Sequence, residues 1–426
     1  MNFKIFTLGC KVNTYESNVM HDRLLNANYF ETETEVADIY IINTCTVTDT
    51  SAHKSLKMVR QCIRKNPEAI IIVCGCMSQV EPERANIDGV SIILGNKYKS
   101  DIVSIIEEYK RDQKQIIKVD NIMASPFEHM VLNNFNRTRA FVKIEDGCEN
   151  YCSYCIIPYA RGKVRSKEPK IVLEEITKLV NDGHREVVLT GIHTGHYGGD
   201  LDNYNFAALL KDILKIEGLE RLRISSIEIT EIDEEILEVF KSSKVLVDHL
   251  HIPIQSGSDE VLKLMNRKYD KAYFIDKVNQ IRNVRPNISL STDLIVGFPG
   301  ETDELFKEAM ETVKQIKFSK IHVFPFSLRK GTRAESMPNH IDDVTKKKRV
   351  KAMIEISESL EVTYMEQFVG KEFTFIPEKY EDGYLIGHTG NYLLIKAKSN
   401  CMNHESLKVK IKEVVYPYCL AEVINV

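Results

Sequence analysis

The sequence predicts an α/β protein in three parts, on three observations. In residues 1 to 120, apolar runs alternate with helical stretches, which indicates a doubly wound βα unit. In residues 134 to 366, six apolar runs alternate with helical stretches, which indicates a partial (β/α)6 barrel of parallel strands. In residues 367 to 426, short alternating strands are separated by turn residues, as in a small antiparallel β-barrel. A linker over residues 121 to 133 separates the first two parts.

Three strands predicted in the first part each end at a cysteine. The runs are "FKIFTLGC", "ADIYIINTC" and "AIIIVCGC", which end at Cys10, Cys45 and Cys76. The predicted helices lie between them, around residues 15 to 27 and 50 to 66. Ligands of open parallel sheets gather outside the carboxyl ends of the strands, so we expect these three thiols at one crevice. Cys74 falls within its apolar run, so Cys76 is the preferred third member. The alternative is that the three are core cysteines at strand ends.

The central part predicts a second group of residues at strand ends. Its six strands are read from "AFVKIED", "EVVLTGIH", "LRISSIE", "HLHIPIQSG", "SLSTDLIVGFPG" and "KIHVFPFS". In barrels of this kind, functional residues sit at the carboxyl ends of the strands. The polar and glycine residues found there are Thr190, Gly191, Ser226, Glu228, Gln255, Asp293 and Gly297. Without a further signal, Glu228 and Gln255 are equally well explained as loop residues with satisfied hydrogen bonds.

Three cysteines, Cys148, Cys152 and Cys155, lie within eight residues just after the first barrel strand. They could be three small buried apolar residues. A structural zinc site is a sharper alternative, but such sites are normally closed by four nitrogen or sulfur ligands, and the next cysteine is Cys401. Three thiolates on one short loop suit an iron–sulfur cluster whose fourth iron stays open to a ligand.

Composition limits the class of protein. No stretch approaches the ~18 apolar residues of a spanning helix, and the N-terminus lacks a signal-peptide core, so the sequence predicts a soluble cytoplasmic protein with no membrane partner. In a reducing compartment, clustered thiols bind metal or react more often than they form disulfides. The net charge of −4 does not indicate a nucleic-acid partner, so any basic surface must be local.

The cysteine motifs resemble a known family. The stretch "GCENYCSYCIIPYARGKVRS", with Tyr154 before its last cysteine, resembles the methylthiotransferases of the radical S-adenosylmethionine (SAM) superfamily. The stretches "GCKVNTYES", "NTCTVTDTSAHKS" and "GCMSQ" resemble the N-terminal part of the same enzymes. In that family, the open iron of one 4Fe-4S cluster binds SAM, which is then split to a radical, while a second cluster carries the sulfur that is donated. The resemblance implies the first cluster on Cys148, Cys152 and Cys155 as the catalytic trio. It implies the second on Cys10, Cys45 and Cys76.

The resemblance also implies the remaining site residues. The residues expected to contact SAM or substrate are Tyr154, Thr190, Gly191, Ser226, Glu228, Gln255, Asp293 and Gly297. The last sixty residues resemble the TRAM domain, an RNA-binding barrel of tRNA-modifying enzymes. Seven lysines there are balanced by seven acidic residues. The lysines of two predicted strands nevertheless fall on alternate positions, which puts each set on one face, as expected of a phosphate-binding stripe. The predicted RNA contacts are Arg161, Lys163, Arg165, Lys396, Lys398, Lys408 and Lys410. The alternative for the barrel lysines is a solvated face.

Other cysteines and histidines carry weaker signals. Cys62 is expected to be a half-buried residue of a helix, and Cys401 and Cys419 to pack within the last part. His193, His196 and the pair His249 and His251, which shares a strand face, could suggest metal binding, but carboxylates are sparse nearby, so a metal site is not expected.

Within the family, "LGCKVNTYES", "NTCTVT", "LTGIHTGHYGGD" and "HVFPFSLRKGTRA" resemble the branch that methylthiolates threonylcarbamoyladenosine in tRNA. Lys11 and the cluster Arg329, Lys330 and Arg333 would suit a substrate that bears a carboxylate. Alternatives are the branches that act on isopentenyladenosine in tRNA or on an aspartate of a ribosomal protein, and a non-catalytic iron–sulfur RNA-binding protein. The expected partners are tRNA, a sulfur donor, and an electron donor such as flavodoxin or ferredoxin.

Overall fold

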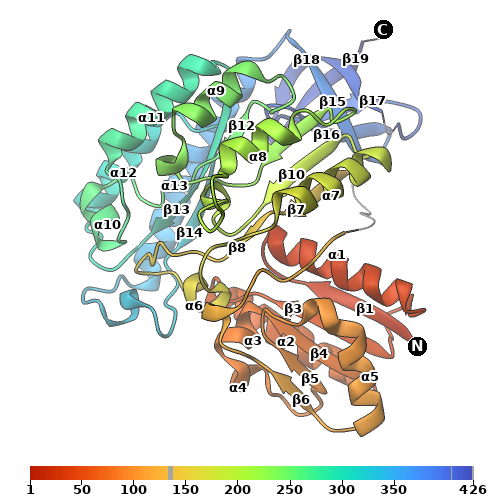
Figure 1. The fold of residues 1–426 in the computed structure, drawn as a ribbon. Coiled ribbons are helices and arrows are strands. Elements are labelled where there is room, and N and C mark those ends of the chain that lie inside the picture. The colour runs from red at the N-terminus through yellow and green to blue at the C-terminus, as the bar shows by residue number, and fades with distance from the viewer. Residues whose placement is uncertain (133–137, 404, 425–426) are drawn as a thin grey trace.

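The computed structural model describes residues 1–132, 138–403 and 405–424, and it confirms the predicted three-part architecture (Figure 1). A six-stranded parallel sheet is followed by six strands arranged as a partial barrel and then by a closed five-stranded barrel. No helix in the described part of the chain is long and apolar enough to span a membrane. The exact boundaries of the three parts stay a prediction.

The N-terminal sheet is parallel throughout, in the order β2-β1-β3-β4-β5-β6. Its strands are β1 (Asn2–Thr7), β2 (Phe30–Glu31), β3 (Ile39–Thr44), β4 (Ile70–Gly75), β5 (Ile92–Leu94) and β6 (Ile116–Lys118). The chain runs from β1 to one side and then returns to place β3 on the other. In open α/β sheets such a reversal creates the crevice where ligands bind.

Helices cover both faces of this sheet. On one face, α1 and α5 pack Leu24 and Ile105 against Ile41 and Ile72 of the central strands. On the other face, α2 packs against a second group of strand side chains, and Cys62 is 1% exposed within it, so the expectation of half-burial was wrong. The helices are α1 (Lys11–Asn26), α2 (Asp49–Lys65), α3 (Cys76–Val80), α4 (Pro82–Ala85), η1 (Lys99–Asp101), α5 (Ile102–Asp112) and η2 (Ile122–Ala124).

The central strands form two parallel three-stranded sheets, β11-β10-β7 and β12-β13-β14, joined by a bridge between Leu222 and Leu246. The strands are β7 (Arg139–Lys143), β10 (Glu186–Thr190), β11 (Arg221–Ile224), β12 (His249–His251), β13 (Ser289–Val296) and β14 (Lys320–Pro325). Leu222, Leu250 and Leu290 lie in the hydrophobic core. Because side chains alternate along a strand, their neighbours Arg223, His249 and His251 lie on the inner face.

The longer helices wrap the outside of the central strands, whereas the short α6 (Ile157–Arg161) lies between these strands and the N-terminal part, beside α3 (Figure 1). The other helical segments of the central part are α7 (Pro169–Asn181), η3 (Thr194–His196), α8 (Phe206–Ile213), η4 (Ile229–Glu231), α9 (Glu234–Ser242), α10 (Asp259–Leu264), α11 (Lys271–Val284), α12 (Asp303–Ile316), η5 (Arg333–Ser336) and α13 (Asp343–Glu366). A short antiparallel pair, β8 (Glu145–Asp146) and β9 (Arg165–Ser166), flanks the cysteine loop. The loop therefore begins and ends at a fixed point.

The C-terminal strands close into a barrel in the order β15-β16-β17-β19-β18. They are β15 (Glu372–Glu381), β16 (Tyr384–Thr389), β17 (Leu394–Lys398), β18 (Leu407–Val415) and β19 (Tyr418–Val423). All pairs are antiparallel except β17 with β19, which is parallel. Phe375, Ile395 and Cys419 are fully buried inside it.

Helix α1 fixes the N-terminal sheet to the barrel. Its Met20 and Leu24 belong to the core of the sheet, whereas its Tyr15 and Val19 belong to the core of the barrel. The Tyr15 hydroxyl lies 2.8 Å from Glu175 Oε1 of α7. A helix buried on two sides holds both parts in one arrangement, so the crevice of the sheet faces the barrel.

Candidate active site

The three N-terminal cysteines meet at the reversal point of the sheet. Cys10, Cys45 and Cys76 follow β1, β3 and β4, which are adjacent strands. Two glycines with left-handed φ allow this approach. A Cβ on Gly9 (φ +105°) would lie 2.9 Å from Cys45 Sγ, and one on Gly75 (φ +103°) would lie 2.5 Å from the Thr44 carbonyl oxygen. Any larger residue there would push the cysteine turns apart.

These thiols are electrostatically coupled. Burial, together with the neighbouring thiols of Cys76 and Cys10, raises the pKa of Cys45 to about 11. Cys10 is exposed at the surface of the crevice, but the protein around it still raises its pKa through desolvation, against the lowering effect of Arg161. Thiolates that repel one another in a poorly solvated crevice are stabilised by a shared cation. Cys74 is 0% exposed within the core of the sheet, apart from this group.

The second trio lies on the loop after β8. Ser153, in the middle of this loop, is bonded to the end of α10. Its Oγ donates to the Leu264 carbonyl at 2.8 Å, and its backbone N–H donates to the Met265 carbonyl at 3.0 Å. Burial raises the pKa of Cys155 to about 12, and Cys152 adds to the rise. Burial also raises the pKa of Cys148, with Cys155 and Cys152 adding to it. The three thiols therefore also act as one group.

The spacing of both trios fits a multi-iron cluster better than a single zinc ion. In a tetrahedral site with Zn–S bonds of about 2.3 Å, sulfur atoms lie roughly 3.8 Å apart. Among the described residues, neither cysteine trio has its sulfur atoms all within 4.8 Å of one another. Three thiols that interact electrostatically, but whose sulfur atoms are farther apart than in a zinc site, suit the corners of a cuboidal cluster. Each trio leaves one corner without a cysteine.

Arg161 joins the two cysteine sites. It ends α6, just after the loop trio, and its Nε donates to Cys76 Sγ at 3.3 Å. Its other nitrogens contact Glu16, Asp146 and Asn13. Burial opposes the ionisation of Asp146, but Arg161 and Lys143 outweigh it and lower the pKa of Asp146 to about 2. The prediction that Arg161 binds RNA was wrong, because the side chain is 0% exposed and saturated with contacts.

The residues expected to contact SAM lie on the loop that carries the second trio or at the ends of the barrel strands. Thr190 ends β10, and its carbonyl already accepts a hydrogen bond from Ile144 N at 2.9 Å. A Cβ on Gly191 would lie 2.7 Å from Glu145 Oε2, so the turn fits closely over that carboxylate. The Tyr154 ring packs edge-on against Phe298, with ring centroids 6.3 Å apart.

The other strand-end residues occupy the next positions around the rim. Ser226 and Glu228 follow β11 and are half-buried. Gln255 has a φ of +64° and bonds through its backbone to Asp293 and Ile295 of β13. Gly297 follows β13, and its N–H donates to Glu301 Oε1 at 2.8 Å. Their roles in binding SAM or substrate stay a prediction.

Two residues of the rim were missed from the sequence. Arg267 Nη1 donates to Cys152 Sγ at 3.2 Å, and its Nη2 pairs with Glu228. Glu145 is fully buried, and burial raises its pKa well above the usual range. Its Oε2 accepts from His193 N at 2.7 Å, while its Oε1 has no partner. Arg267 belongs to no sequence motif, so only the fold reveals it. Glu145 lies at the end of the predicted strand "AFVKIED", so the same strand-end rule could have found it.

Histidines also meet carboxylates here. His193 is 5% exposed, stacks on His196 with ring centroids 4.5 Å apart and pairs with Glu231. The expectation that carboxylates are sparse around the 249–251 pair was wrong, because the parallel register of β12 and β13 puts Asp293 Oδ2 3.4 Å from His251 Nε2. These pairs fix ring orientations at the rim.

The other predicted RNA contacts differ in accessibility. Lys163 is exposed, whereas Arg165 is 9% exposed and its guanidinium is bonded to backbone carbonyls, including that of Arg161 at 2.6 Å. In the C-terminal barrel, the predicted lysines lie on the outer surface, on β17 and on β18. Lys398 and Lys408 are exposed, and Lys410 is half-buried. Lys396 lies 4.2 Å from the ring centroid of Tyr418.

The basic residues of the segment 329 to 333 differ in their exposure to solvent. Arg329 is 5% exposed and holds Thr46 and Glu81 of the N-terminal part, so it cannot serve as a substrate contact as the sequence suggested. Lys330 and Arg333 are exposed. Arg329 is instead a second link between the barrel and the Cys45 turn.

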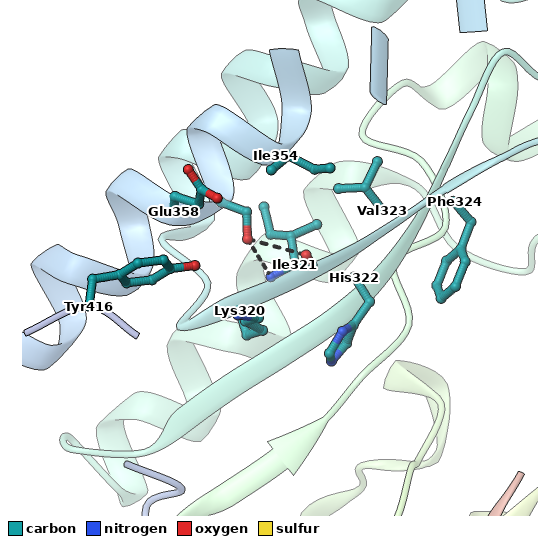
Figure 2. Close-up of a pocket in the computed structure, with 9 residues that line it drawn as sticks. Lys320, Ile321, His322, Val323, Phe324, Ile354, Glu358 and Tyr416 are labelled. Carbon is teal, nitrogen blue, oxygen red and sulfur yellow. Dashed lines mark hydrogen bonds between the residues drawn. The ribbon is translucent and has the colours of Figure 1, made fainter. Parts of the chain in front are cut away.

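A cavity of about 290 Å³ lies at β14, the free edge of the barrel. Figure 2 shows His322 and Phe324 on the opposite side of β14 from Ile354 and Glu358. Ser357 Oγ accepts from Ile321 N at 3.0 Å, which holds α13 against the strand. The cavity contains none of the cysteines or the predicted strand-end residues, so it is separate from the two cysteine sites.

Family models match two parts of the chain. Residues 142–313 match the radical SAM superfamily, and residues 2–95 match the uncharacterized protein family UPF0004. The fold is similar to that of the radical SAM methyltransferase TsrM from Kitasatospora setae, with a TM-score of 0.57 and 14% identity over 78% of this chain and 76% of that one. Together, the barrel, the cysteine loop and the family match define a radical SAM enzyme.

Two curated relatives narrow the class. The chain is 43% identical over 423 residues to the threonylcarbamoyladenosine tRNA methylthiotransferase MtaB of Bacillus subtilis, across 97% of this chain and 94% of the relative. It is 35% identical over 399 residues to the tRNA-2-methylthio-N(6)-dimethylallyladenosine synthase of Clostridium botulinum, across 91% and 89%. The chain belongs to the radical SAM methylthiotransferase family.

Proposed function

We propose that this enzyme methylthiolates C2 of N6-threonylcarbamoyladenosine at position 37 of tRNA, next to the anticodon. The observation that carries the proposal is the 43% identity over 97% of the chain to a relative of that activity, against 35% for a relative named for dimethylallyladenosine. The overall change replaces the C2–H bond by a C2–S–CH3 group, with the methyl group from one SAM and the hydrogen removed by a second.

Two cysteine trios meet the two needs of this reaction. Cys148, Cys152 and Cys155 would hold a cluster that could supply the electron needed to split SAM, and Cys10, Cys45 and Cys76 would hold one that could supply the sulfur. The protein holds the two trios in a fixed relation through Arg161, which contacts Cys76 and follows the loop trio directly. Arg267 orients Cys152 and Glu228 at the rim.

The substrate approaches from the barrel mouth, and the C-terminal barrel holds the tRNA. The exposed Lys398 and Lys408 supply phosphate contacts there, and Lys163 supplies one beside the loop trio. An electron donor such as flavodoxin or ferredoxin and a sulfur donor complete the cycle. Because tRNA is the substrate, the reaction takes place in the cytoplasm.

The test is mass analysis of nucleosides after anaerobic turnover of reconstituted enzyme with defined tRNAs. We expect a methylthio product from tRNA that bears threonylcarbamoyladenosine and none from unmodified tRNA. Product from isopentenyladenosine alone, or from a ribosomal protein without tRNA, would assign the enzyme to another branch. The absence of deoxyadenosine under reduction would indicate a non-catalytic iron–sulfur protein.

A further inference from the structure

The inner face of the barrel contains positive side chains that none of the roles above uses. Arg139 begins β7 and Arg223 lies in β11, and both face the ring of Tyr392. Their guanidinium carbons lie 5.6 and 4.8 Å from the centroid of that ring. The His249 ring of β12 stacks on it at 4.5 Å. A side chain from the turn between β16 and β17 therefore reaches the inner face of three barrel strands.

Tyr392 remains accessible although it is surrounded. The residue is 37% exposed, and its backbone has a φ of +65°, which places it in a conformation that only the surrounding contacts hold. Its hydroxyl accepts a hydrogen bond from Arg139 Nη1 at 3.4 Å, which leaves its own hydrogen free to donate. Burial opposes the ionisation of Tyr392, but Arg139, Lys11 and Arg223 hold its pKa below the usual value.

Lys11 enters the same space from the N-terminal part. It follows Cys10 in the first turn of α1, and its charge interacts with Tyr392, Arg139 and Arg223. Helix α1 packs against β7, the strand that Arg139 begins, and the charge of Lys11 also interacts with His249 of β12 and His322 of β14. In the described ranges, Lys11 has no ion pair and no side-chain hydrogen bond.

The carboxylates nearby are already engaged. Glu186 of β10 pairs with Arg223 at 2.7 Å and with Arg221 at 3.5 Å. Glu378 of β15 pairs with Arg139 at 3.0 Å and with His388 at 2.6 Å. Arg223 Nη2 is buried without a partner. The space beside Lys11 therefore has an excess of positive charge, which an anionic ligand would balance.

We propose that Lys11, Arg139 and Tyr392 bind the carboxylate of the threonylcarbamoyl group on the substrate base. This inference rests on the proposed function, because only that substrate branch carries a carboxylate on N6. The position fits the chemistry: C2 and the N6-bearing carbon of adenine both adjoin N1, and Lys11 directly follows a cysteine of the sulfur-donating trio. A base presented with C2 toward that trio has its N6 group near Lys11.

Binding of a carboxylate at this site would also explain how the enzyme selects threonylcarbamoyladenosine over dimethylallyladenosine. Sites built to bind a polar group reject analogues that lack it, because the site's own polar groups are then left unpaired. The dimethylallyl group is uncharged and would leave the excess positive charge of this site without a partner. Arg223, behind the Tyr392 ring and 1% exposed, contributes charge rather than direct contact.

The test compares binding by reconstituted holoenzyme without reductant, so that no turnover occurs. Three tRNAs are used: one with threonylcarbamoyladenosine, the same tRNA with that carboxylate blocked as a methyl ester, and one with unmodified adenosine. The variant is Lys11→Met, and the matched control is Lys57→Met, on the exposed face of α2. Iron content and the visible absorption spectrum of each variant are checked first, because Lys11 adjoins Cys10.

We expect the wild-type enzyme and Lys57→Met to prefer the free carboxylate over the ester by about 10- to 100-fold, the range for one charge-assisted contact. Lys11→Met should lose most of that preference and bind unmodified tRNA as the wild type does. Tyr392→Phe, which removes one hydroxyl and leaves the cysteines untouched, should lose a smaller part of it.

The contradicting outcomes are distinct. If Lys11→Met keeps the preference, the site is wrong. If it weakens binding of all three tRNAs equally, Lys11 contacts a backbone phosphate instead. In both cases the wild-type enzyme would still methylthiolate the natural substrate, whereas a wild-type enzyme that never does so would overturn the proposed function itself.

Discussion

Arg161 Nε lies 3.3 Å from Cys76 Sγ, although 85 residues separate the two in sequence. The arginine follows the cysteine loop of the barrel, and the cysteine ends a strand of the N-terminal sheet. One buried guanidinium therefore fixes the distance between the two candidate cluster sites. The same guanidinium is paired with Glu16 and Asp146, so its loss affects both parts of the protein.

Arg161→Met should lower the free energy of unfolding of the apo protein by about 3–5 kcal/mol, because it leaves two buried carboxylates with fewer partners. Chemical denaturation measures this directly. The matched control is Lys163→Met, two residues away and exposed, which should change the stability by less than about 0.5 kcal/mol. Equal effects of the two changes would contradict the central role of Arg161.

Replacing Cys148, Cys152 and Cys155 by alanine should abolish SAM cleavage and remove about half of the roughly eight irons expected for two 4Fe-4S clusters. The reason is that the N-terminal trio lies on separate strands and stays intact. Iron analysis and deoxyadenosine release are the measurements. A Cys62→Ala variant, altered only in the core of the N-terminal sheet, should keep its iron and its activity. Retained SAM cleavage in the triple variant would assign that chemistry elsewhere.

The C-terminal lysines can be tested through salt dependence. Each lysine that contacts a phosphate should reduce the slope of log affinity against log salt by about one when changed to alanine. We expect this for Lys398→Ala and Lys408→Ala in tRNA binding. Lys379→Ala is the control, since this lysine on β15 is already paired with Glu381. Slopes unchanged in all three variants would move the RNA contacts to the loop near Lys163.

Glu186 predicts a pH dependence of stability. Burial opposes its ionisation, but Arg223 and Arg221 outweigh it and lower its pKa. A lowered folded-state pKa gives a stabilisation that is present above the unfolded-state pKa of about 4.3 and is lost as the pH falls below it. The loss of apo-protein stability on acidification should therefore be smaller in Glu186→Gln. Glu220→Gln, a control at a half-exposed pair, should follow the wild type. If Glu186→Gln loses as much stability on acidification as the wild type, Glu186 does not contribute to the pH dependence.

The same arginines connect this carboxylate to the C-terminal barrel. Arg221 donates to the carbonyls of His388 and Thr374, at 3.0 and 2.6 Å, and Arg223 to that of Gly390 at 3.3 Å. Glu186→Gln should therefore also loosen the C-terminal barrel, seen as faster proteolysis between residues 366 and 372. Unchanged proteolysis would show that the backbone contacts hold the barrel without Glu186.

The features that could be predicted from the sequence are those that depend on local patterns of apolar residues. Apolar runs that end at Cys10, Cys45 and Cys76 indicated parallel strands, and parallel strands bring their ends together whatever the intervening sequence. The burial of Arg161 and the position of Arg267 on Cys152 depend on segments far apart in the chain. Periodicity carries no record of such pairings, so a conspicuous basic motif was mistaken for an exposed one.

We propose that the N-terminal trio holds a sulfur-donating cluster distinct from the one that cleaves SAM. The most direct measurement is parallel product analysis of a variant with Cys10, Cys45 and Cys76 all changed to alanine. We expect this variant, given SAM and reductant, still to release deoxyadenosine but to form no methylthiolated nucleoside on tRNA. Formation of that nucleoside at the wild-type rate would contradict this proposal.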